Sequence, residues 1–83
     1  MIKITLYSKP NCHLCDEIML ILEKVKNNIN FELNLINIES DLDLYKKYCE
    51  KIPVLYINGK LFAKYKVDEL KLLKKLNSVT KTH

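Results

Sequence analysis

The sequence predicts one α/β domain, a four-stranded mixed sheet with helices packed on its faces. Its 83 residues suffice for a single domain with a modest core. The apolar pattern changes period along the chain and predicts the element order β-α-β-α-β-β-α. In the first half, a helix follows a strand and precedes another, which predicts a βαβ unit with parallel strands. In the second half, an Asn-Gly pair predicts a hairpin.

The first half of the chain supplies two strands and the longest helix. Residues 2–7 alternate apolar and polar side chains and predict a strand, and Pro10 lies in the loop that follows. Residues 31–37 alternate in the same way and predict the second strand. Between them, from Cys12 to Asn27, the spacing is helical, and the expected apolar face consists of Leu14, Ile18, Ile21, Leu22 and Val25.

The second half predicts a short helix, a hairpin and a last helix. The short helix is capped by Ser40-Asp41 and ends before Pro53. The hairpin strands, residues 54–57 and 60–64, flank Asn58-Gly59, where a type I′ turn needs positive φ at both positions. The side chains of the short helix expected to face the core are Leu42, Tyr45 and Tyr48.

The last helix starts at Asp68 and completes the domain. Its expected core-facing side chains are Leu70, Leu73 and Leu76. We therefore expect the folded domain to cover residues 1–76 and the polar tail, residues 77–83, to be frayed.

Charge and cysteine content argue against several classes of protein. The formal net charge is +4, and no arginine occurs. Arginine supplies the bidentate contacts that read guanine and clamp phosphate, so its absence favours a solvated basic surface over a nucleic-acid site. The sequence has no recognisable targeting segment or membrane span, and three cysteines do not make a secreted disulfide framework. We expect a cytoplasmic protein that binds neither nucleic acid nor membrane.

Cys12 and Cys15 carry the strongest chemical signal. Cysteines three residues apart share a helix face and lie close enough for a small adjustment to join them in a disulfide. Cys12 lies at the start of the helix, where unpaired N–H groups and the helix dipole stabilise a thiolate. Cys12 is therefore the expected attacking thiol, and Cys15, one turn deeper, the expected resolving thiol.

A zinc half-site and a pair of inert thiols are the alternatives for these cysteines. Structural zinc takes four ligands, and the residues left to supply them are Cys49, His13 and His83, whose spacing does not match such a site. The preceding strand and the βαβ context favour redox chemistry.

The chain resembles a glutaredoxin-type member of the thioredoxin superfamily. The resemblance rests on Leu6-Tyr7-Ser8-Lys9-Pro10-Asn11-Cys12-His13-Leu14-Cys15 and on the later Ile52-Pro53-Val54, and it extends from Ile2 to about Leu76. The segment is similar to small glutaredoxin-like proteins with a Cys-His-Leu-Cys-Asp-Glu core. The resemblance implies a thioredoxin/glutaredoxin-like fold with three helices and a thiol–disulfide oxidoreductase.

The same resemblance implies roles for four more residues. Pro53 would be cis and face the Cys12 sulfur, which leaves the Ile52 backbone free to pair with an extended substrate or glutathione; the alternative is a trans proline that opens a strand. Lys9 and Asp68 match glutathione-binding positions, with a surface charge and a simple N-cap as the alternatives. The chain departs from the family at residues 64–67, Lys-Tyr-Lys-Val, where glutaredoxins usually carry Gly-Gly.

Three further residues are candidates for modulating the site. A protonated His13 would stabilise the Cys12 thiolate, and an exposed helix residue without effect is the alternative. Tyr7 precedes residues 8–11, the loop that leads to Cys12 and that we call the cysteine loop. Tyr7 is a candidate substrate contact. Cys49 is a small buried hydrophobe or, as the alternative, a regulatory or second resolving thiol.

These observations predict a monomeric dithiol reductase of protein or glutathione mixed disulfides. We expect no bound cofactor or metal, and glutathione as the reductant. One alternative is a thioredoxin-type protein recharged by a flavin-dependent reductase. Another is a binding module that uses Cys12 to hold zinc or an iron–sulfur cluster.

Overall fold

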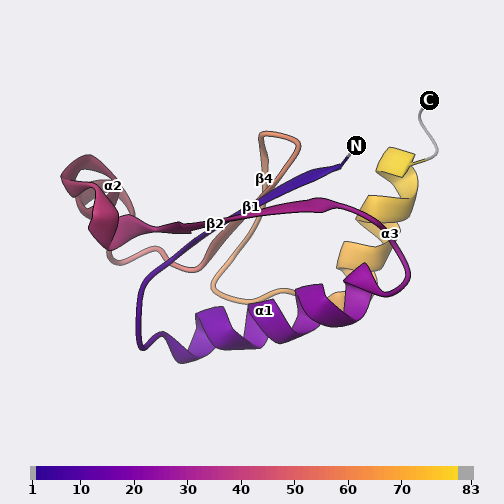
Figure 1. Ribbon diagram of the computed structural model, residues 1–83, viewed down its shortest axis with the longest axis horizontal. Helices are drawn as coiled ribbons and strands as arrows, with labels where there is room; N and C mark the ends of the chain where they lie inside the picture. Colours follow the sequence, from indigo (N-terminus) through magenta and orange to yellow (C-terminus); the bar gives the residue numbers. More distant parts are fainter. Residues whose placement is uncertain (1, 81–83) are drawn as a thin grey trace.

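The computed structural model describes residues 2–80 (Figure 1). Its elements, in chain order, are β1 (Lys3–Ser8), α1 (His13–Lys26), β2 (Glu32–Asn37), the 3₁₀-helix η1 (Ile38–Ser40), α2 (Leu42–Tyr48), β3 (Val54–Ile57), β4 (Lys60–Lys64) and α3 (Glu69–Thr80). The predicted order of strands and α-helices is confirmed, and η1 precedes α2. Among the helices of this range, none is long and apolar enough to cross a membrane.

The strands form a mixed sheet in the order β2-β1-β3-β4. β1 and β2 pair in parallel, as the βαβ unit predicts, whereas the β1–β3 and β3–β4 pairs are antiparallel. Asn58 and Gly59 form the hairpin turn with φ values of 51° and 81°. Asn58 ties this turn to β1, because its backbone N–H donates to the Lys3 carbonyl and its side-chain oxygen accepts from the Lys3 N–H.

The main core lies between one face of the sheet and the helices α1 and α3. Figure 1 shows α1 running along the strands, and α1 contacts α3. Alternate residues of β1 and β3 point into this core because successive strand side chains face opposite sides. Its buried strand and helix members are Ile4, Leu6, Ile18, Leu22, Val25, Leu55, Ile57, Leu72 and Leu76.

A second, smaller cluster lies where α2 packs, at the end of the molecule opposite α3 in Figure 1. We call it the α2 cluster, and its buried members are Cys15, Ile38, Tyr48, Ile52 and Val54. It draws on α1, η1, α2 and β3, so it joins segments that are far apart in the sequence.

The prediction that α2 directs three side chains to the core is wrong for two of them. Tyr48 is buried, but Leu42 and Tyr45 are 67% and 42% exposed. α2 has only seven residues, and it covers the end of the sheet rather than its full width. A helix that meets the sheet over so short a contact buries only the side chains of its last turn.

The apolar face predicted for α3 is also partly wrong. Leu72 and Leu76 are fully buried, whereas Leu70 is 69% exposed and Leu73 only half-buried. The leucines of α3 permit two overlapping apolar faces, one with Leu70, Leu73 and Leu76 and one with Leu72 and Leu76. Packing against the sheet buries the second face. The Asp68 carboxylate caps the helix by accepting the N–H of Leu70, so Leu70 belongs to the exposed first turn.

The last helix continues through Thr80, so residues 77–80 belong to α3, and their expected fraying stays a prediction. The remainder of the predicted tail, residues 81–83, lies outside the described residues. The predicted domain boundary after residue 76 stays a prediction.

The two apolar faces of α3 can be told apart by stability. Leu72→Ala should lower the free energy of unfolding by about 2–5 kcal/mol, because it removes a fully buried side chain. Leu70→Ala should change it by less than about 0.5 kcal/mol. Urea denaturation of both variants measures the difference, and equal losses would contradict this orientation of α3.

Candidate active site

Cys12 caps the N-terminus of α1. Asn11 adopts a left-handed φ of 59°, which asparagine tolerates, and turns the chain from the loop into the helix. Cys12 itself is extended, with φ −104° and ψ 108°. Its sulfur accepts the backbone N–H of Cys15 at 3.2 Å, and its carbonyl accepts that of Asp16 at 3.1 Å. A thiolate at Cys12 would receive the same N–H together with the positive end of the helix dipole.

Cys12 and Cys15 are joined in a disulfide, with their Cα atoms 5.2 Å apart. The two sulfurs lie in different surroundings. Cys15 is only 4% exposed and belongs to the α2 cluster, whereas Cys12 is half-buried and packs against the edge of that cluster. Cys12 is therefore the more exposed residue of the pair.

The Ile52-Pro53 peptide bond is cis, as the family resemblance implies. Ile52 and Val54, the residues on either side of Pro53, are buried in the α2 cluster against which Cys12 packs. The register of β1 and β3 accounts for this proximity, because Tyr7 pairs with Val54 at the end of both strands. The cysteine loop leaves β1 at this end, and Pro53 enters β3 there.

Three aromatic rings, Tyr7, Tyr48 and Tyr56, form what we call the tyrosine cluster. Tyr7 stacks on Tyr48 with ring centroids 4.6 Å apart and meets Tyr56 edge-on at 5.7 Å. The hydroxyls of Tyr48 and Tyr56 are 3.4 Å apart. This hydrogen bond, followed by burial and the charges of Tyr56 and Tyr7, raises the pKa of Tyr48 to about 12.

The sequence did not reveal the tyrosine cluster as a unit. Tyr7 and Tyr56 lie on neighbouring strands, and their shared face follows only from the β1–β3 register. Tyr7 lies against the α2 cluster, as Cys12 does. Its predicted contact with substrate stays a prediction.

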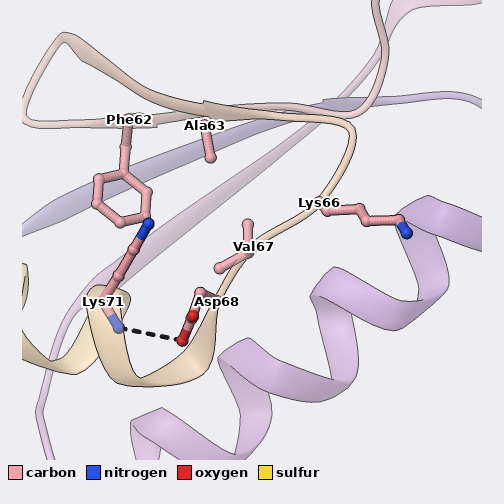
Figure 2. A pocket seen from close by; sticks show the side chains of 6 residues that line it. All are labelled: Phe62, Ala63, Lys66, Val67, Asp68 and Lys71. Carbon is pink, nitrogen blue, oxygen red and sulfur yellow. Dashed lines mark hydrogen bonds between the residues drawn. The ribbon is translucent and has the colours of Figure 1, made fainter.

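Lys9 and Asp68 line two different cavities in the part of the chain that the structure describes. Lys9 is exposed and lines a cavity of about 310 Å³ together with Cys15 and Leu35. Asp68 lines a separate cavity of about 470 Å³ between β4 and α3 (Figure 2). Its carboxylate accepts the backbone N–H groups of Leu70 and Lys71, so it acts as an N-cap.

His13 and Cys49 flank the cysteine pair in different ways. The His13 side chain is 87% exposed and lies 3.3 Å from the Glu17 carboxylate, one helical turn away. Its predicted effect on the Cys12 thiolate stays a prediction, to be tested by the Cys12 pKa in His13→Ala.

Cys49 is a free, half-buried thiol that packs against the α2 cluster. Within residues 2–80, no three His, Cys, Asp or Glu side chains are grouped as a metal site requires.

Comparison with known proteins identifies a family and similar solved structures. The family model described as the glutaredoxin-like domain (DUF836) matches residues 3–77. Protein Ne2328 from Nitrosomonas europaea is 30% identical, with a TM-score of 0.76 over 90% of this chain and 91% of that one. A structure from X. campestris is 25% identical, with a TM-score of 0.73 over 90% of this chain and 96% of that one.

Thioredoxins share the fold at lower identity. A mutant thioredoxin from Halobacterium salinarum is 17% identical, with a TM-score of 0.70 over 99% of this chain and 77% of that one. Mitochondrial thioredoxin 3 from Saccharomyces cerevisiae, in its oxidized form, is 14% identical, with a TM-score of 0.65 over 93% of this chain and 77% of that one. The predicted thioredoxin-like fold is confirmed.

Because the pKa of Tyr48 is raised, we expect the free energy of unfolding to fall at alkaline pH. The fold favours the neutral phenol, so this contribution is complete below pH 10 and is lost as pH rises towards 12. Urea denaturation at pH 10 and pH 12 measures how much unfolding free energy is lost between these two pH values. This loss should be smaller in Tyr48→Phe than in the wild type. The control Tyr45→Phe, at an exposed tyrosine, should retain the wild-type loss. An identical loss in all three proteins would contradict the assignment to Tyr48.

Proposed function

This chain belongs to the glutaredoxin-like domain family, and we propose that it is a dithiol oxidoreductase that reduces protein or glutathione mixed disulfides. The thioredoxin fold and the Cys12–Cys15 pair support thiol redox activity in general. The observation that carries the proposal is the unequal placement of the two sulfurs. One lies half-buried at a helix N-terminus and the other lies in an apolar cluster.

In the first step, the Cys12 thiolate attacks one sulfur of the substrate disulfide. A bond forms between Cys12 and that sulfur, the substrate S–S bond breaks, and the second substrate sulfur leaves as a thiolate. The N–H of Cys15, which donates to the Cys12 sulfur, supports the thiolate before attack. Cys12 is the more exposed of the two residues, and this supports assigning the first attack to it.

In the second step, Cys15 loses its proton to solvent and attacks the Cys12 sulfur. The Cys12–Cys15 disulfide forms, and the remaining substrate sulfur leaves as a thiolate. Two electrons and two protons pass in total from the dithiol to the substrate. The 5.2 Å separation of the Cα atoms lies in the usual range for a disulfide, so resolution needs no large movement of α1.

Glutathione is the proposed reductant of the Cys12–Cys15 disulfide. Two glutathione molecules would reduce it and be released as glutathione disulfide. In this proposal Ile52 offers backbone groups to the tripeptide or to an extended substrate beside Pro53, and Lys9 and Asp68 hold its charged ends. We further propose a monomer without a bound cofactor. We also propose a cytoplasmic location, in keeping with three cysteines that do not make a secreted disulfide framework.

Substitution of single cysteines tests the assigned roles. Cys12→Ser should abolish disulfide reduction because it removes the attacking sulfur. Cys15→Ser should accumulate a mixed disulfide at Cys12, visible by mass spectrometry, because the resolving sulfur is missing. Cys49→Ser is the matched control and should reduce the substrate as the wild type does. Continued reduction by Cys12→Ser would contradict the mechanism, and colour or bound zinc after anaerobic purification would favour a metal-binding module.

A coupled assay tests the reductant. With glutathione, glutathione reductase and a mixed-disulfide substrate, the wild type should consume NADPH and Cys12→Ser should not. If the wild type is inactive there but active with thioredoxin reductase, the protein belongs with the thioredoxin-type alternative. In that case Lys9→Ala and Asp68→Ala should have no effect on turnover.

A further inference from the structure

Tyr65 directly follows β4 and lies against the segment that carries Pro53. Its backbone N–H donates to the Pro53 carbonyl at 2.8 Å. Its hydroxyl donates to the Glu50 carbonyl at 3.3 Å. The side chain therefore reaches across residues 50–53 and is held at both ends, by its backbone and by its hydroxyl.

The backbone of Tyr65 is strained. Its φ of 66° lies in the left-handed region, where the Cβ of any residue other than glycine meets the backbone. Asn11 and Asn58, the other described non-glycine residues with positive φ, carry the short polar side chain that tolerates this region. Tyrosine has no such advantage, and residues held in this way gather at functional sites. The strained backbone therefore indicates that Tyr65 has a functional role.

Tyr65 follows the end of β4 that pairs with the start of β3, next to the α2 cluster. The preceding residue, Lys64, pairs with Val54, which belongs to the cluster against which Cys12 packs. Tyr65 is 44% exposed, so a large part of the residue remains open to an incoming molecule. An exposed aromatic ring offers apolar area and the edge or face contacts that other rings prefer.

The chemistry of the two substrate classes differs at such a ring. Glutathione consists of γ-glutamate, cysteine and glycine, and it has no apolar side chain to lay on an aromatic ring once its sulfur is bound. A protein segment that carries a disulfide has neighbouring side chains, and an apolar one gains by leaving water. The ring therefore adds contact for a protein substrate alone.

We propose that Tyr65 is a specificity-determining residue, whose ring packs against an apolar side chain beside the disulfide of a protein substrate. It thereby favours protein disulfides over glutathione mixed disulfides. This inference rests on the proposed disulfide exchange at Cys12.

Single-turnover rates test this proposal without any recycling reductant. Protein reduced with dithiothreitol and then desalted is mixed either with insulin or with the mixed disulfide of glutathione and β-mercaptoethanol. Tyr65→Gly removes the ring and suits the positive φ, and Tyr65→Asn is a second ring-free variant that tolerates it. Tyr65→Phe keeps the ring and loses the bond to Glu50. Tyr45→Ala is the matched control at another exposed tyrosine.

We expect Tyr65→Gly and Tyr65→Asn to reduce insulin about fivefold to tenfold more slowly and the glutathione mixed disulfide no more slowly than the wild type. Tyr65→Phe and Tyr45→Ala should keep the wild-type ratio of the two rates. The reduction potential of the Cys12–Cys15 couple should be the same in all five proteins, because the ring acts on recognition.

The contrary outcomes distinguish a failure of the proposed role of Tyr65 from a failure of the proposed exchange at Cys12. Equal slowing on both substrates, or no change on either, would overturn the role of Tyr65 and leave the exchange at Cys12 standing. The same loss in Tyr65→Phe as in Tyr65→Gly would assign the effect to the Glu50 hydrogen bond and overturn the role of the ring. A wild type that reduces neither substrate would overturn the proposed function itself.

Discussion

The antiparallel pairing of β1 with β3 is the interaction on which the rest of the site depends. The cysteine loop begins where β1 ends, and Pro53 stands where β3 begins. Because the strands run in opposite directions, these two points meet at one edge of the sheet, where Tyr7 pairs with Val54. A shift of one residue in this register would turn the side chains of one strand to the other face, so that Tyr7 and Val54 would no longer share a face.

That edge of the sheet also creates the difference between the two cysteines. α1 begins there, so Cys12 lies among unpaired N–H groups at the polar end of a helix. One turn later, Cys15 points into the α2 cluster, where apolar side chains exclude water. The same helix thus places one cysteine at its N-terminal N–H groups and the other among apolar side chains. The order of attack in the proposed mechanism follows from this contrast.

The residues around the cysteine pair come from β1, β3 and α2. Tyr7 and Tyr56 place rings beside Tyr48 on the face that α2 covers. Beyond β4, Tyr65 returns to the Pro53 segment and is held there by two hydrogen bonds. Among residues 2–80, Lys9 and Asp68 line separate cavities.

Local sequence patterns predict the strands and α-helices, the parallel βαβ unit, the Asn58-Gly59 turn and the Cys12–Cys15 pair, because these depend on periodicity and on residues close together in the chain. The family resemblance added the cis bond at Pro53. Tertiary structure alone decided that α3 buries Leu72 rather than Leu70, and that Tyr65 closes on the Pro53 segment. Periodicity predicts that a helix exists, but its rotation against the sheet, and any contact between distant segments, is set only when the elements dock.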